Sequence, residues 1–122
     1  MPDPIFIILY VDDPPASAAF YSRLLARPVI ESSATFALLP LREGTMLGLW
    51  SRHTVAPSAE GGGGGAEVAF TVSARDEVDA THAQWRALGL TILQAPDDMD
   101  FGRTFVALDP DRHRLRVFAP NG

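Results

Sequence analysis

Residues 101–118 read FGRTFVALDPDRHRLRVF, and this stretch decides the fold. Apolar and polar residues alternate from Leu115 to Phe118, as a half-buried strand requires, and an Asp-Pro-Asp step at residues 109–111 predicts a tight turn before it. A strand before the turn completes a hairpin. The earlier segment from Thr35 to Trp50 has a similar pattern, so the chain looks like two copies of one unit.

The predicted elements repeat in the same order. Thr-Phe segments begin at residues 35 and 104, an offset of 69, and the strand-ending aromatic residues Trp50 and Phe118 are offset by 68. A nearly fixed offset with a matching element order is typical of an internal duplication. Each half is predicted to form a strand, a helix and three strands. These elements span residues 5–11, 14–26, 29–32, 35–39 and 45–50 in the first half, and residues 67–72, 74–88, 91–94, 103–108 and 114–118 in the second.

Local signals set several boundaries. Asp13 is a suitable N-cap for a helix that starts at Pro14, and Ser73 is predicted to cap the second helix. The strand at residues 5–11 is apolar on both faces, which predicts a central strand that is covered on each side. Residues 53–66 contain five consecutive glycines and are predicted to form a flexible connector. We therefore predict a single domain, residues 1–122, with a first module at residues 1–52 and a second module at residues 67–120.

The composition excludes several classes of partner. A chain of 122 residues with 47% hydrophobic content is long enough for one sizeable core. Its net charge of −5 gives no electrostatic reason to bind nucleic acid or an anionic membrane, and no apolar run reaches the roughly 20 residues of a membrane span. With no cysteine and no leader of the secretory type, the chain is expected to be cytoplasmic and to lack disulfides and thiolate metal sites.

Three segments carry a family pattern. They are YVDDP at residues 10–14 followed by AFYSRLL at 19–25, EVAFTV at 67–72, and FVALDPDRHRL at 105–115. In this order and spacing they resemble the vicinal oxygen chelate superfamily, which includes glyoxalase I, extradiol dioxygenases, fosfomycin-resistance enzymes and bleomycin-resistance proteins. The resemblance implies an α+β fold of two paired βαβββ modules that curl into cups. It also implies a homodimer with exchanged elements and two clefts.

The resemblance further implies four strand positions for metal ligands. In this chain Phe6, Gly48, Glu67 and Arg116 occupy them, and only Glu67 is a ligand for a divalent ion. The fixed positive charge of Arg116 opposes a cation by about 4 kcal/mol per unit charge at about 4 Å and an effective dielectric near 20. We therefore expect no metal, no cofactor and no catalytic residue. We predict instead that Glu67 and Arg116 form a salt bridge across adjacent strands.

Alternation along the strands assigns side chains to the concave face of the sheet. Aromatic walls, with room left at Gly48, favour a flat apolar ligand, although each ring taken alone fits a core equally well. Trp50 is expected to be only partly buried unless a ligand stacks on it, and Trp85 is expected in the core. The acidic residues 97–100 are interpreted as a loop that attracts a cationic ligand or is simply solvated. The predicted ligand-binding residues are Phe6, Tyr10, Phe36, Met46, Trp50, Glu67, Phe101, Phe105, Arg114 and Arg116.

These features favour a metal-free binding protein that sequesters an aromatic or peptide antibiotic in a cleft at a dimer interface and so confers drug resistance. The alternative is a glyoxalase- or dioxygenase-type metal-dependent enzyme that acts on a small metabolite. A third interpretation is a metabolite-binding protein whose ligand the sequence does not identify. The loss of metal ligands at three of the four positions favours a binding protein over an enzyme.

Overall fold

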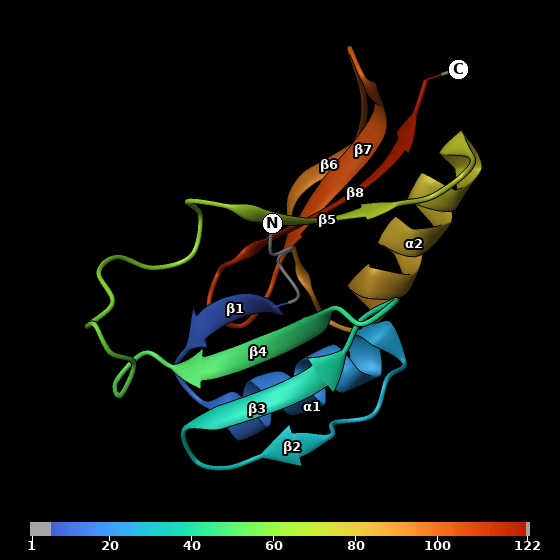
Figure 1. Ribbon diagram of the computed structural model, residues 1–122. Helices are drawn as coiled ribbons and strands as arrows, with labels where there is room; N and C mark the ends of the chain where they lie inside the picture. Colours follow the sequence, from blue (N-terminus) through green and yellow to red (C-terminus); the bar gives the residue numbers. More distant parts are fainter. Residues whose placement is uncertain (1–5, 122) are drawn as a thin grey trace, which may run out of the picture. The chain divides into compact units, whose positions relative to one another are not determined.

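A computed structural model describes residues 6–121, so Ile5, predicted to begin the first strand, lies outside them. The chain divides into two compact units, Met1–Gly61 and Gly62–Gly122, each with one helix and a four-stranded mixed sheet (Figure 1). This repeated order confirms the predicted α+β fold of two βαβββ modules. The elements are β1 (Phe6–Val11), α1 (Pro14–Leu25), β2 (Glu31–Ser32), β3 (Phe36–Pro40), β4 (Met46–Ser51), β5 (Glu67–Thr71), α2 (Arg75–Ala87), β6 (Thr91–Met99), β7 (Gly102–Leu108) and β8 (Arg114–Pro120).

The two sheets have the same topology. Their strand orders are β1-β4-β3-β2 and β5-β8-β7-β6, with the first pair of each sheet parallel and the other pairs antiparallel. In the first unit α1 packs against β3 and β4, and in the second α2 packs against β6, β7 and β8 (Figure 1). The core of each unit therefore lies between its helix and one face of its sheet. No helix among the described residues is long and apolar enough to cross a membrane.

The helix starts depend on local hydrogen bonds. Asp13 has an extended backbone, and its Oδ1 accepts a hydrogen bond from the Ala16 N–H at 3.2 Å, which confirms the predicted cap of α1. The N-cap of α2 is Ala74, which makes no side-chain cap hydrogen bond. Ser73 donates its hydroxyl to Glu77 Oε1 at 2.6 Å instead. The predicted cap of α2 is therefore wrong by one residue.

β1 is an edge strand, not the covered central strand that its sequence predicts. Within the described residues it pairs only with β4. Phe6, Ile7, Ile8 and Tyr10 are 40–47% exposed, whereas Val11 at the end of the strand is buried. The prediction failed because an apolar residue at every position is compatible with an uncovered edge as well as with a covered centre.

The turn between β7 and β8 constrains the glycine run. Asp109 Oδ1 accepts hydrogen bonds from the N–H groups of Asp111 (2.9 Å) and His113 (2.8 Å), and its Oδ2 lies 2.8 Å from His113 Nδ1. Arg112 in this turn has φ 68°, a conformation that favours glycine. Gly63 lies so close to the backbone of the turn that a Cβ atom would overlap it. The run is therefore more than a flexible connector, because Gly63 packs where no other residue fits.

Candidate ligand-binding site

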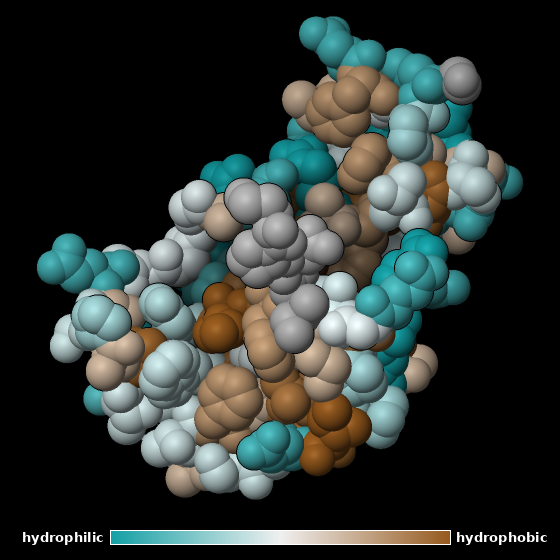
Figure 2. Space-filling model, viewed as in Figure 1, coloured by the Kyte–Doolittle hydropathy of each residue, from teal (hydrophilic) through white to brown (hydrophobic). Residues whose placement is uncertain are grey.

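One face of the first sheet, opposite α1, gathers five of the predicted ligand-binding residues. Tyr10, Trp50 and Phe36 lie side by side across β1, β4 and β3, and Phe6 and Met46 are partners further along the same strands. The rings of Phe36 and Trp50 meet edge to face with centroids 6.3 Å apart. We call these five residues the aromatic face. Figure 2 shows hydrophobic side chains on the part of the surface where β1, β3 and β4 lie in Figure 1.

The aromatic face is partly accessible. Phe6 is 47% and Tyr10 44% exposed, and Phe36, Met46 and Trp50 are half-buried. The Trp50 ring packs edge to face against Phe36 and is half-buried, in agreement with its expected partial burial. The face contains no charged side chain, so it suits a flat apolar ligand.

The space above Gly48 is filled by a neighbouring ring. A Cβ atom on Gly48 would lie 3.1 Å from Cζ of Phe36 and 3.4 Å from Cγ1 of Ile8. The expectation that Gly48 leaves room for a ligand is therefore wrong, because Phe36 occupies that room. A ligand reaches the strand at this point only if the Phe36 side chain rotates away.

On the second sheet, Glu67 and Arg116 form the predicted salt bridge across β5 and β8. Arg116 donates from Nε to Oε1 at 2.9 Å and from Nη2 to Oε2 at 3.0 Å. Ala69 lies opposite Arg116 in the strand pairing, so Glu67, two residues before it, is the diagonal neighbour on the same face. The side chains are 32% and 19% exposed. Two parallel hydrogen bonds in a half-buried setting are a strong form of ion pair.

Other side chains fix the position of the Arg116 guanidinium. Nη1 donates to Thr104 Oγ1 at 3.2 Å and to Gln94 Oε1 at 3.5 Å, and Cζ lies 5.9 Å from the centroid of the Phe101 ring. Thr104 is fully buried and donates its own hydroxyl to the Val117 carbonyl at 2.9 Å. Our sequence reasoning missed Thr104 and Gln94. The position of Gln94 depends on register shifts in β6 that the sequence does not reveal.

The arginines also control the ionisation of Glu67. Hydrogen bonds from Arg116 lower the pKa of the Glu67 carboxyl below 4.5, burial opposes this, and the charges of Arg116 and Arg114 lower the pKa further. Because the pKa is lower in the folded state, the pair stabilises the fold above about pH 4.5. This contribution is lost as the pH falls through the folded-state pKa.

Replacing Glu67 with glutamine is expected to lower the free energy of unfolding by about 1–2 kcal/mol at pH 7, because Arg116 loses its charged partner. The loss is expected to shrink as the pH falls below 4.5 and the wild-type carboxyl becomes protonated as well. Urea unfolding at pH 7, 5 and 3 measures both effects. Glu43→Gln is the control, since the Glu43 side chain is 83% exposed and pairs with Arg42 only at 3.6 Å. A pH-independent loss, or an equal loss in the control, would contradict the prediction.

Two more predicted site residues lie near the salt bridge. Arg114 is the strand partner of Glu67, and its side chain is half-buried. Phe101 is 43% exposed, and its ring meets that of Phe118 edge to face with centroids 5.8 Å apart. The second sheet therefore combines arginines with aromatic side chains, whereas the aromatic face of the first sheet is uncharged.

Phe105 is not a site residue, so this prediction is wrong. Its side chain is fully buried on the opposite face of the second sheet, beneath α2. Its ring lies 5.4 Å from that of Trp85 and 5.3 Å from that of His82, centroid to centroid. Phe105 therefore belongs to the core of the second unit, as does Trp85, whose burial confirms its predicted place.

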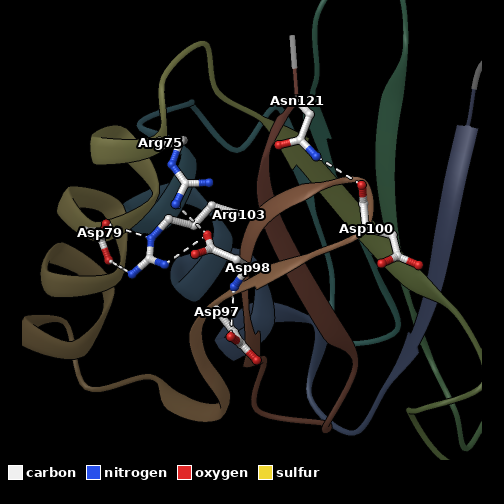
Figure 3. A network of polar contacts seen from close by, with 7 residues as sticks. All are labelled: Arg75, Asp79, Asp97, Asp98, Asp100, Arg103 and Asn121. Atoms are coloured by element: carbon white, nitrogen blue, oxygen red, sulfur yellow. Dashed lines mark hydrogen bonds and ion pairs between the residues drawn. The ribbon is translucent and has the colours of Figure 1, made fainter.

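The acidic residues 97–100 do not form a free loop, because β6 extends to Met99. Asp98 Oδ1 accepts hydrogen bonds from Arg75 (2.6 Å) and Arg103 (3.2 Å), and Arg103 also binds both carboxylate oxygens of Asp79 at 2.9 Å (Figure 3). Hydrogen bonds from Arg75, then Arg103, lower the pKa of Asp98, and the bond from Arg103 lowers that of Asp79. The interpretation of this stretch as a site for a cationic ligand is therefore wrong for Asp98, whose charge is already neutralised.

Comparison with known proteins identifies the family. Residues 5–117 match the sequence model of the Glyoxalase/Bleomycin resistance protein/Dioxygenase superfamily. The chain belongs to this superfamily. This agrees with the resemblance to vicinal oxygen chelate proteins, and no curated protein sequence matches the chain.

Solved structures share the fold. Protein ATC0852 from Agrobacterium tumefaciens is 56% identical over 100% of both chains, with a TM-score of 0.92. A glyoxalase/bleomycin resistance protein/dioxygenase from Nocardioides is 26% identical over 98% of this chain and 84% of its own, with a TM-score of 0.82. Lactoylglutathione lyase from Agrobacterium tumefaciens is 18% identical over 98% and 94% of the two chains, with a TM-score of 0.77, which shows a common fold alone.

The residues at the four superfamily metal positions do not fit a metal ion. Phe6 and Gly48 have no side-chain donor atom, and Arg116 is cationic. Both carboxylate oxygens of Glu67 accept hydrogen bonds from Arg116. Among the described residues no group of three or more His, Asp or Glu side chains is arranged to hold a metal. The only metal-binding side chain at these positions is therefore committed to an ion pair.

Proposed function

We propose that this member of the glyoxalase/bleomycin resistance superfamily is a metal-free binding protein that sequesters an aromatic or peptide antibiotic. In this proposal the protein acts as a homodimer and confers resistance by holding the drug without altering it. The bidentate ion pair between Glu67 and Arg116 carries the argument, because it occupies two of the four metal positions with groups that satisfy each other.

The aromatic face supports the proposed ligand class. Exposed Tyr10 and Phe6 and half-buried Trp50 offer ring surfaces on one side of a sheet, with no charged side chain among them. A ligand that buries about 300 Å² of apolar surface gains about 7.5 kcal/mol, and each aromatic contact adds about 0.5–1.5 kcal/mol. Ordering costs offset part of this gain. We therefore expect a dissociation constant in the micromolar range, which corresponds to a binding free energy near −8 kcal/mol.

Tryptophan fluorescence tests the proposal directly. The protein is titrated with a panel of polycyclic aromatic and peptide antibiotics, and quenching is compared in the wild type, Trp50→Phe and Trp85→Phe. The Trp85→Phe variant keeps Trp50 as its only tryptophan, whereas Trp50→Phe keeps buried Trp85 as an internal control. Saturable quenching that persists in Trp85→Phe and disappears in Trp50→Phe is the expected result. Quenching that Trp50→Phe leaves unchanged, or no saturable quenching, would overturn the proposal.

Metal titration separates a binding protein from the alternative, a metal-dependent enzyme. The protein is dialysed against Zn²⁺, Ni²⁺, Mn²⁺ and Fe²⁺ in turn, and bound metal is measured by elemental analysis. No stoichiometric binding is expected, and Arg116→Glu is the matched variant because it restores a carboxylate ligand beside Glu67. One ion per wild-type chain would favour the enzyme. Light scattering of the purified protein tests the proposed dimer.

A further inference from the structure

One face of the second sheet holds two arginines beside a single glutamate. Arg114 and Arg116 lie two residues apart on β8, so they share a face with Glu67, which is the strand partner of Arg114. Arg116 alone binds both oxygens of the Glu67 carboxylate. One carboxylate and two guanidinium groups leave a local charge of about +1.

Arg114 has no partner in the described part of the chain. No hydrogen bond or ion pair to its guanidinium occurs among residues 6–121, although its side chain is half-buried. Its charge nevertheless contributes to the lowered pKa of Glu67, so the two groups lie within electrostatic reach of each other. A half-buried guanidinium with free N–H groups is a donor for an incoming anion.

Other acidic residues lie near this pair of arginines, but none of them binds Arg114. Asp97 is the strand partner of Thr104, which accepts a hydrogen bond from Arg116. Asp109 and Asp111 belong to the turn just before Arg114, and Asp109 is hydrogen-bonded to His113. Within the described residues no ion pair joins any of these carboxylates to Arg114. Arg114 is therefore an uncommitted cation on this face, in a chain whose net charge is −5.

Aromatic side chains adjoin the arginines. The Phe101 and Phe118 rings meet edge to face at 5.8 Å, and the Arg116 guanidinium lies over the Phe101 ring at 5.9 Å. The hydrogen bonds of Arg116 hold it against this pair. The face thus offers an apolar ring surface at Phe101 and Phe118 and an uncommitted cation at Arg114, with Arg116 between Arg114 and Phe118 along β8.

We propose that this face of the second sheet binds aryl anions, with Arg114 binding the carboxylate and Phe101 and Phe118 contacting the ring. Arg116 positions the ring surface and keeps Glu67 from binding Arg114. The inference concerns residues of the second unit alone, so it does not depend on Trp50 or on the proposed antibiotic ligand.

Isothermal titration calorimetry with three probes of one shape tests this inference. The probes are 2-naphthoate, neutral 2-naphthamide and cationic 2-naphthylmethylamine, each titrated into the full chain at low ionic strength. We expect naphthoate to bind about tenfold more tightly than naphthamide and the amine to bind most weakly, because only the carboxylate carries a charge opposite to that of Arg114. Equal binding of the three probes, or no binding of naphthoate, would overturn the inference.

Matched variants separate a contact at Arg114 from the effect of net charge. Arg114→Gln is expected to weaken naphthoate binding about tenfold and to leave naphthamide unchanged. Arg86→Gln removes the same charge from the exposed end of α2 and is expected to leave both unchanged. Arg114→Lys keeps the charge without the planar fork and should give an intermediate affinity. Equal effects of Arg114→Gln and Arg86→Gln would show that only net charge matters and would overturn the inference, whatever the Trp50 titration shows.

Discussion

Replacing Gly102 with alanine is expected to lower the free energy of unfolding by about 3 kcal/mol or more. Gly102 opens β7 with φ 151°, and a Cβ atom there would overlap the carbonyl oxygen of Ala119 on the neighbouring strand. Because that oxygen belongs to the backbone of β8, relief requires the strands to separate rather than a side chain to rotate. Urea unfolding, followed by Trp85 fluorescence and circular dichroism, measures the loss.

The control separates steric overlap from backbone conformation. Gly44 also has a positive φ, 80°, but a Cβ atom there would meet nothing within 4 Å. Gly44→Ala is expected to cost only about 1 kcal/mol, the conformational penalty for a residue with a side chain. Similar losses for Gly102→Ala and Gly44→Ala would show that β7 and β8 tolerate the added atom.

Replacing Phe105 with alanine is expected to cost about 3–5 kcal/mol, because the ring is fully buried between the second sheet and α2. Its removal leaves a cavity beside Trp85 and His82. Urea unfolding measures the loss, and Phe105→Leu provides a milder change of about 1–2 kcal/mol if the alanine variant does not fold.

Phe101 is the matched aromatic residue for this experiment. Its ring is 43% exposed, so Phe101→Ala is expected to cost less than about 1 kcal/mol of stability while weakening the binding of naphthoate and naphthamide alike. Phe105→Leu is expected to leave both affinities unchanged. A loss of affinity in Phe105→Leu without a loss of stability would restore Phe105 as a ligand-binding residue.

The sequence predicted best where the signal was local or had period two. Asp13 caps α1 because the acceptor, the extended backbone and the following prolines lie within a few residues. The pairing of Glu67 with Arg116 was predictable because alternation places both on one face of adjacent strands. The prediction needed the order of the strands, which came from the resemblance, but no detail of packing.

Predictions failed where the answer depended on contacts from distant parts of the chain. The five residues of β7 from Thr104 to Leu108 are all buried, so no alternation of apolar and polar residues showed which way Phe105 points. The sequence alone suggests that Asp98 is solvated, because the two arginines that bind it, Arg75 and Arg103, lie on other elements. Strand β1 was predicted to be a central strand from its hydrophobicity, but hydrophobicity alone does not show whether a strand lies at the centre or at the edge of its sheet.

The fold position held by Gly48 in the first unit is held by Arg116 in the second. Gly48 is the partner of Ile8, the third residue of β1, and Arg116 is the partner of Ala69, the third residue of β5. Copying the β4 residue into β8 alone would put glycine in place of arginine. Glu67 would then keep its half-buried carboxylate without the cation that binds it, which destabilises the fold. Strands β5 and β8 of the second repeat therefore have to change together, because Glu67 on one strand is suited to Arg116 on the other.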